Sequence, residues 1–328
     1  MDSPEQPDLR RPWSRISLTT GTSVSRDTRR AEYPALPPRL GRGDRLGDLT
    51  LEEELACGAN SSVYRAAEIS TRRQVAVKVL SSNLSLHPEA VGRFRAESAL
   101  AERVHHASIL PIFGRSQDRG YHYYVMRLES GNTLEDCSTE ATLHKDEAFY
   151  VSLARRFACL ARALHEVHES SIVHRDVKPA NVLLDGKGRY VLTDFGSALD
   201  TTDRDRLLED TVGGTVVYMS PEQLRPGADP YDPAGDIYSL GLTLYEVCTG
   251  SLPFPHASDT ETARLKLTRV PQPPRRLNHH IPLGLEAIIR QAIETFPQLR
   301  HPSAESMARD LERFAERKRA SCRGLHHF

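Results

Sequence analysis

Apolar and polar positions follow two different periods along the chain, and the change of period divides it into two parts. In the first part, short apolar runs rich in valine alternate with turns. These runs predict strands at residues 49–55, 62–67, 74–80, 109–113 and 121–128. One segment of this part repeats its apolar residues at helical spacing and predicts a helix over 88–105. We therefore expect a sheet accompanied by one helix.

Helical periodicity dominates the second part. Residues 147–168 carry apolar side chains on one side of a long helix, and 236–248 is almost continuously apolar, as in a buried helix. Amphipathic helices are predicted at 285–294 and 304–318. A strand-rich part followed by a helix-rich part predicts an α+β protein of two lobes, with a ligand-binding cleft between them.

The first 45 residues are poor in large apolar side chains and contain nine arginines and six acidic residues. Such a segment cannot bury enough surface to offset its ordering entropy, so we predict a disordered Arg/Ser/Pro-rich tail over 1–45. Several hydroxyl residues lie among the arginines, which leaves open a docking or autophosphorylation role. They are Ser14, Ser23, Ser25 and Thr28.

The overall composition is that of an ordinary soluble protein, with 328 residues, 27% charged residues and a net charge of -1. The near-zero charge gives no reason to expect nucleic acid or an anionic membrane as a partner. No run approaches the roughly 20 apolar residues of a membrane span. Five scattered cysteines without metal-ligand spacing fit a reducing compartment. We therefore expect a cytoplasmic protein.

A carboxylate, an ammonium group and an amide occur within six residues, at Asp176, Lys178 and Asn181. This combination suits a metal-bound anion. The apolar segments 172–173 and 182–184 on both sides indicate a loop held between buried strands rather than a solvated turn. A second carboxylate follows shortly after, at Asp194 in an Asp-Phe-Gly triplet, and offers hard oxygen ligands for Mg²⁺.

Lys78 ends the apolar run Val75-Ala76-Val77 in a predicted strand, and Glu97 lies in the predicted helix that follows. A lysine in such a strand is usually an edge or snorkelling residue. Here the helix offers it a carboxylate partner.

Taken in order along the chain, these motifs resemble those of eukaryotic-like (Hanks-type) serine/threonine protein kinases, most closely the bacterial members. The resemblance covers residues 46–316 and implies the two-lobed protein-kinase fold. We expect a small β-rich N-lobe with one key helix at 46–126 and a hinge at 127–132. A larger helical C-lobe is expected at 133–316 and a C-terminal tail at 317–328.

The resemblance also implies a role for each charged residue. Asp176 orients the substrate hydroxyl and accepts its proton, and Lys178 stabilises charge on the transferring phosphate. Asn181 and Asp194 hold Mg²⁺, for which Mn²⁺ is a possible substitute. Lys78 reaches the α- and β-phosphates of ATP, and an ion pair with Glu97 fixes the lysine and reports that the helix is docked.

The glycine-rich loop departs from the family pattern of three glycines followed by a valine. Aligned on Val63, this chain has Ala56, Gly58 and Ser61 at the three positions. Backbone amides can still face phosphates, but Ala56 and Ser61 restrict how closely the loop covers them. Further ATP contacts implied by the resemblance are an apolar ceiling and floor, a gatekeeper and hinge backbone groups. Val63 and Ala76 would form the ceiling and Leu183 the floor. Met126 would be the gatekeeper, and the hinge backbone groups would be those of Arg127 and Glu129.

Several features favour a protein substrate and a serine or threonine hydroxyl. Lys178 and the Gly214-Thr215 pair match serine/threonine rather than tyrosine kinases. By resemblance, Thr215 bonds the catalytic loop near Asp176 and Lys178. Glu222 is expected to pair with Arg300, and Asp236 to bond the backbone of the catalytic loop. Val216 replaces the proline often found after that threonine.

We therefore expect an ATP-dependent serine/threonine protein kinase that phosphorylates protein substrates. Activation-loop autophosphorylation, with possible self-association, is expected at Thr201, Thr202 or Thr211, with Arg175 pairing with the phosphate. One alternative is a pseudokinase that binds partners without efficient catalysis, which the altered glycine loop motivates. Another is a small-molecule kinase of related fold; the closing segment Ser220-Pro221-Glu222 and Asp236 argue against it.

Overall fold

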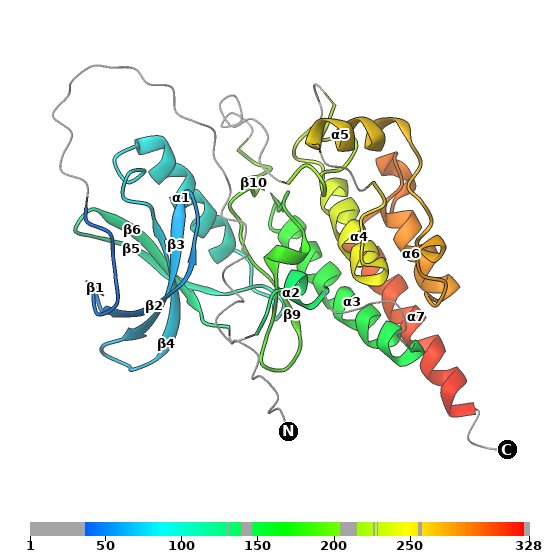
Figure 1. The fold of residues 1–328 in the computed structure, drawn as a ribbon, viewed down its shortest axis with the longest axis horizontal. Coiled ribbons are helices and arrows are strands. Elements are labelled where there is room, and N and C mark those ends of the chain that lie inside the picture. Colours follow the sequence, from blue (N-terminus) through cyan, green and yellow to red (C-terminus); the bar gives the residue numbers. More distant parts are fainter. Residues whose placement is uncertain are drawn as a thin grey trace, which may run out of the picture.

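The computed structural model describes residues 37–129, 131–138, 146–203, 215–225, 227, 229–254 and 258–324. Figure 1 shows the strand-rich first part on one side and the helix-rich second part on the other. This arrangement confirms the predicted α+β fold of two lobes.

Six antiparallel strands form the sheet of the N-lobe, in the order β1-β2-β3-β4-β6-β5. One helix, α1 (Pro88–Glu102), accompanies it and contributes Phe94 to the apolar cluster beneath the sheet. The predicted single helix of this lobe is therefore present, three residues shorter than expected. The strands are β1 Arg45–Leu46, β2 Leu49–Cys57, β3 Ser61–Glu68, β4 Gln74–Leu80, β5 Ile112–Asp118 and β6 Tyr121–Arg127.

The strand predicted at 109–113 is present, but its bounds are wrong, because only residues 112 and 113 belong to β5. Strand β5 begins at Ile112, and the residues before it run beside β9 (Tyr190–Leu192). The N–H of Leu110 donates to the carbonyl of Leu192 at 2.9 Å. The apolar residues at 109 and 110 are buried because they connect the two lobes, and a short apolar run does not distinguish that role from a strand of the sheet.

The C-lobe is built around α4, which is buried along almost its whole length. A Cβ added at Gly241 would lie 2.6 Å from the Cβ of Ala292, so the glycine lets α4 approach α6 closely. Helices α3 and α7 pack along one another (Figure 1). The helices are α2 Leu134–Ser138, α3 Glu147–Glu169, α4 Ala234–Thr249, α5 Asp259–Thr268, α6 Leu283–Ala292 and α7 Ala304–Gly324.

Two small antiparallel sheets lie between the lobes and hold the loops that carry charged residues. Strand β7 (Ile172–Val173) pairs with β10 (Leu199–Asp200), and β8 (Val182–Leu184) pairs with β9. The short 3₁₀ helices are η1 Pro179–Asn181, η3 Pro274–Arg276 and η4 Pro297–Leu299. Because β7 and β8 flank residues 174–181, the expected loop between buried strands is present.

The four predicted C-lobe helices correspond to α3, α4, α6 and α7, with shifts of a few residues at their ends. Helix α7 continues past residue 318 to Gly324, into the segment predicted as a tail. Helices α2 and α5 were not predicted. Across the part of the chain that the structure describes, every helix is too short or too polar to cross a membrane.

Candidate active site

The three charged or polar residues of the loop between β7 and β8 meet at the carboxylate of Asp176. The ammonium of Lys178 donates to Asp176 Oδ2 at 2.7 Å. The amide of Asn181 donates to the same oxygen at 2.9 Å and to the Asp176 carbonyl at 2.8 Å. All three side chains are buried. Two side chains of the same loop, the ammonium of Lys178 and the amide of Asn181, therefore hold the Asp176 carboxylate in place.

Thr215 joins this cluster from a distant part of the sequence. Its N–H donates to Asp176 Oδ1 at 3.2 Å, and its hydroxyl accepts a hydrogen bond from Lys178 Nζ at 2.6 Å. The predicted contact of Thr215 with Asp176 and Lys178 is thus confirmed. Both oxygens of the Asp176 carboxylate are engaged, which sets its orientation.

Asp236, in the first turn of α4, holds the backbone of the catalytic loop as predicted. Its two oxygens accept from the N–H of His174 at 2.8 Å and of Arg175 at 2.7 Å, and Oδ2 lies 2.9 Å from His168 Nε2. Arg175 has a φ of 66°, a conformation that non-glycine residues rarely adopt. The buried carboxylate compensates for that unfavourable backbone.

Lys78 on β4 joins the two lobes through two carboxylates. Its ammonium lies 2.6 Å from Glu97 Oε1 on α1 and 3.2 Å from Asp194 Oδ1, which follows β9. The hydroxyl of Tyr124 on β6 also donates to Glu97, at 2.7 Å. The predicted pair of Lys78 and Glu97 is therefore formed, and α1 is docked against the site.

The electrostatics of this group favour a charged Lys78. Burial by itself lowers the pKa of the lysine, but the carboxylates of Asp194 and Glu97 outweigh that effect and raise it well above its ordinary value. The site therefore presents a fixed ammonium group between the lobes.

Among the residues that the structure describes, two buried oxygen atoms in the site have no hydrogen-bond partner, Asn181 Oδ1 and Asp194 Oδ2. Buried polar atoms of a native site are normally satisfied, so an unpartnered pair points to a bound group. Amide and carboxylate oxygens are the ligand type that a hard divalent cation prefers. The residues predicted to hold a metal therefore fit one chemically.

The predicted adenine-binding side chains belong to one apolar cluster that spans the lobes. Val63 and Ala76 come from the sheet, and Met126 lies at the end of β6. Leu183 reaches the same cluster from β8. The cluster therefore combines the proposed ceiling, gatekeeper and floor in one apolar group.

The turn between β2 and β3 is closed by a hydrogen bond from the N–H of Gly58 to the carbonyl of Ser61, at 2.9 Å. The residues that replace the outer two glycines, Ala56 and Ser61, are buried at the strand ends. The turn therefore tolerates both substitutions without disrupting the hairpin.

In the predicted hinge, the N–H of Arg127 donates to the carbonyl of Pro111 at 3.1 Å, so this backbone donor is already paired within the protein. The side chains of Arg127 and Glu129 form an ion pair. The prediction concerns backbone groups at Arg127 and Glu129 without specifying donor or acceptor. Of these groups, the Arg127 N–H could contact adenine only by giving up its internal bond.

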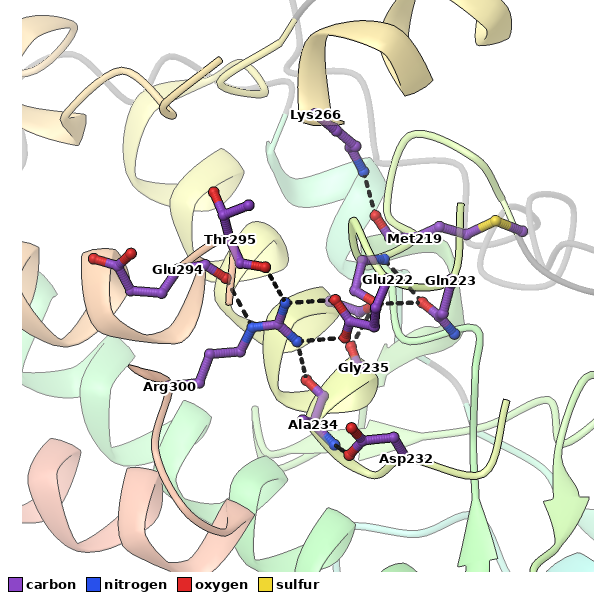
Figure 2. A network of polar contacts seen from close by, with 12 residues as sticks. Met219, Glu222, Gln223, Asp232, Ala234, Gly235, Lys266, Glu294, Thr295 and Arg300 are labelled. Atoms are coloured by element: carbon purple, nitrogen blue, oxygen red, sulfur yellow. Dashed lines mark hydrogen bonds and ion pairs between the residues drawn. The ribbon is translucent and has the colours of Figure 1, made fainter. Parts of the chain in front are cut away.

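The segment after Thr215 is tied to the C-lobe by the predicted pair of Glu222 and Arg300. The two guanidinium NH groups lie 2.6 and 2.7 Å from the two carboxylate oxygens. Arg300 also donates to the carbonyls of Ala234, Glu294 and Thr295, as Figure 2 shows. One buried arginine thus connects this segment with the start of α4 and the turn before α7.

Two residues of this region were missed by the sequence reasoning, Tyr124 and Lys266. Lys266 lies on α5, whose polar sequence has no apolar period, and its ammonium contacts the segment after Thr215. No signal in the sequence marks either residue. Of the predicted regulatory residues, Thr211 lies outside the described residues, as does Gly214.

Comparison with known proteins identifies relatives of this chain. Residues 49–327 match the family model described as protein kinase domain. A probable serine/threonine-protein kinase of Clostridium acetobutylicum is 32% identical over 80% of this chain and 39% of its own length. The serine/threonine-protein kinase PknB of Mycobacterium leprae is 34% identical over 84% of this chain and 44% of its own. For PrkC of Bacillus subtilis the values are 33%, 78% and 38%.

The chain therefore spans about two fifths of the length of the curated relatives it matches.

Proposed function

Because this chain belongs to the protein kinase family, we propose that it transfers the γ-phosphate of ATP to serine and threonine hydroxyls of protein substrates. We place this reaction in the cytoplasm, the compartment that its cysteine content favours. The observation that supports the proposal most is that Lys178, Asn181 and Thr215 all bind the carboxylate of Asp176. The second charged group of the site is formed by Lys78, Glu97 and Asp194.

Phosphoryl transfer needs a positioned hydroxyl and stabilisation of the phosphate charge more than it needs covalent chemistry. Asp176 is the residue that would orient the hydroxyl and accept its proton. Lys178, whose ammonium lies against Asp176 and Thr215, would stabilise charge on the transferring phosphate. Lys78 would bind the phosphates that remain on the nucleotide.

Asn181 and Asp194 would hold the divalent cation, which we propose is Mg²⁺, with Mn²⁺ as a possible substitute. When bound, the cation neutralises phosphate charge. The two unpartnered oxygens, Asn181 Oδ1 and Asp194 Oδ2, support this assignment. The apolar cluster that contains Val63, Ala76, Met126 and Leu183 supports adenine as the base, bound between the ceiling residues Val63 and Ala76 and the floor residue Leu183.

The contacts of Lys178 support serine and threonine as acceptors. Its ammonium lies 2.6 Å from the hydroxyl of Thr215. This contact brings the segment that begins at Thr215 close to Asp176. The relatives named serine/threonine-protein kinases support the same acceptor hydroxyls.

We further propose autophosphorylation in the activation loop, at Thr201, Thr202 or Thr211. Thr202 is exposed, and its hydroxyl donates to Asp200 Oδ1 at 2.6 Å. A phosphate there would repel that carboxylate, so modification would change the conformation after β10.

Incubation with labelled ATP, Mg²⁺ and a generic basic protein tests the proposed activity. Wild type is expected to transfer phosphate, and Asp176→Asn to transfer at least about a hundredfold less, because its amide cannot accept the proton. Glu169→Gln, the same change at an exposed site, is the matched control. Equal background incorporation by wild type and Asp176→Asn would favour the pseudokinase alternative instead.

A further inference from the structure

The segment Thr215–Met219 forms a tight helical turn beside the catalytic loop. The N–H of Tyr218 donates to the carbonyl of Thr215 at 2.8 Å, and the N–H of Met219 to that of Val216 at 3.3 Å. A single turn of this kind leaves most of its carbonyl oxygens without partners inside the turn. Their partners must come from elsewhere in the protein.

One side chain, Lys266 of α5, supplies most of these partners. Its ammonium donates to the carbonyls of Val216 at 3.2 Å, Val217 at 2.6 Å and Met219 at 2.6 Å. Figure 2 shows the side chain of Lys266 extending from α5 to the Met219 carbonyl. Ser239 of α4 donates to the remaining one, that of Tyr218, at 2.9 Å. Every carbonyl from 216 to 219 is therefore held by a side chain of α5 or α4.

Lys266 is almost completely buried, with 2% of its surface exposed. Its ammonium lies 5.5 Å from the centre of the Tyr238 ring, and the guanidinium of Arg300 lies 4.8 Å from the same ring. Glu222 is the carboxylate whose charge acts on it. Burial of an ammonium group costs free energy unless its N–H groups are hydrogen-bonded. Here the three N–H donors of Lys266 match three carbonyl acceptors.

The turn leads directly into the catalytic group. Thr215, its first residue, donates to Asp176 and accepts from Lys178. The side chains of Val216 and Val217 are partly exposed beside it. A shift of the turn would therefore move both the contact with Asp176 and the partly apolar surface next to it.

We propose that Lys266 is a positioning residue for the acceptor substrate: it holds the turn Val216–Met219 in the shape that presents a polypeptide to Asp176. The inference rests on the proposed function, because it assigns the turn to the acceptor side of that reaction. Lys266 touches neither substrate nor nucleotide and acts through the backbone of the turn.

The state of Lys266 gives this role a pH dependence. Burial lowers the pKa of the lysine to about 7, against the opposing effect of Glu222. Above that pH the neutral amine has two N–H donors for three carbonyl oxygens, so one carbonyl loses its hydrogen bond from Lys266. The peptide KM of the wild type is therefore expected to rise as the pH increases through about 7. Tyr238, whose ring lies 5.5 Å from the ammonium, and Glu222, whose charge acts on it, are the titratable groups that face Lys266 among the described residues, and Arg300 lies over the same Tyr238 ring.

Steady-state kinetics of Lys266→Met with a serine peptide test the proposal. We expect the peptide KM to increase about tenfold or more, with the KM for ATP unchanged, and the rise of peptide KM with pH to disappear. Lys187→Met, at an exposed lysine in the turn between β8 and β9, is the matched control and should behave as wild type. An unchanged peptide KM in a folded Lys266→Met protein would overturn the proposal.

Hydrogen exchange of the amides from 216 to 222 gives a readout that does not depend on activity. Lys266→Met should accelerate exchange there and leave the amides of β4 unchanged. If Lys266→Met does not fold, Ser239→Ala removes the hydroxyl that lies within hydrogen-bond distance of the Tyr218 and Gly235 carbonyls, and it should produce a smaller change of the same kind. Absence of phosphate transfer by wild type would reject the proposed function, whereas unchanged exchange in this segment would reject the anchoring role itself.

Discussion

The residues of the site differ in how visible they are in the sequence. Lys78 stands out because its charge interrupts an otherwise apolar strand. Asp176 stands out because a lysine and an asparagine lie within the same six residues. Tyr124 and Lys266 carry no such contrast, since their importance comes from contacts with Glu97 and with a distant turn. Sequence reasoning therefore finds residues with unusual local surroundings and misses those defined by tertiary contacts.

Asp236 is the residue through which α4 orients the catalytic loop, and it leads to a prediction about stability. In Asp236→Asn, one acceptor oxygen becomes an NH₂ group that faces a backbone N–H of His174 or Arg175. We expect the free energy of unfolding at pH 7 to fall by about 1–3 kcal/mol. Urea unfolding measures it, with Asp203→Asn at an exposed position as control.

The same pair of proteins should differ in pH dependence. Burial raises the pKa of Asp236, but the hydrogen bond and charge of His168, together with His174, outweigh that effect and hold it below the ordinary value of 3.8. A lowered folded-state pKa stabilises the protein above the unfolded pKa, and this stabilisation is lost as the pH falls through the folded value. The difference between wild type and variant should shrink below about pH 4. A difference that stays constant as the pH falls well below 4 would contradict the assignment.

Helices and strands are predicted well where their apolar residues repeat with one period or form one continuous run. β4 was predicted with its observed ends, because after the exposed Gln74 its residues are buried on both faces and, apart from Lys78, apolar. α5 was missed, since only Thr262 and Lys266 on it are buried and both are polar. The boundary near Ile109 was wrong because that residue pairs with Leu192 of β9 instead of joining the sheet.

Arg300 connects three elements of the C-lobe, and its removal should destabilise all of them together. Its side chain is fully buried and its guanidinium binds Glu222 through both nitrogens. Arg300→Met leaves the partly buried Glu222 carboxylate without a cation and removes the donors to three carbonyls, so we expect a loss of about 3–5 kcal/mol in the free energy of unfolding. Arg300→Lys should recover little, because an ammonium cannot form the paired contact.

Thermal and urea unfolding measure this loss, with Arg290→Met on the exposed side of α6 as the matched control. Full stability in Arg300→Lys would show that charge alone, without the paired geometry, holds the segment after Thr215.

At the scale of the whole molecule, the site exists only where the two lobes meet. Lys78 from the N-lobe contacts Asp194 beside the C-lobe, and Leu183 of β8 joins the apolar cluster of the N-lobe sheet. The order of the motifs was sufficient to predict the two-lobed fold. It was not sufficient to predict how the lobes are joined, because backbone pairs such as Leu110 with Leu192 leave no sequence pattern.

The most direct test of the proposed function compares acceptor peptides that differ only in one residue, serine, threonine, tyrosine or alanine, with labelled ATP and Mg²⁺. The account predicts transfer to the serine and threonine peptides, little to the tyrosine peptide and none to the alanine peptide, with all transfer lost in Asp176→Asn. Transfer to tyrosine alone, or incorporation that Asp176→Asn retains in full, would contradict it.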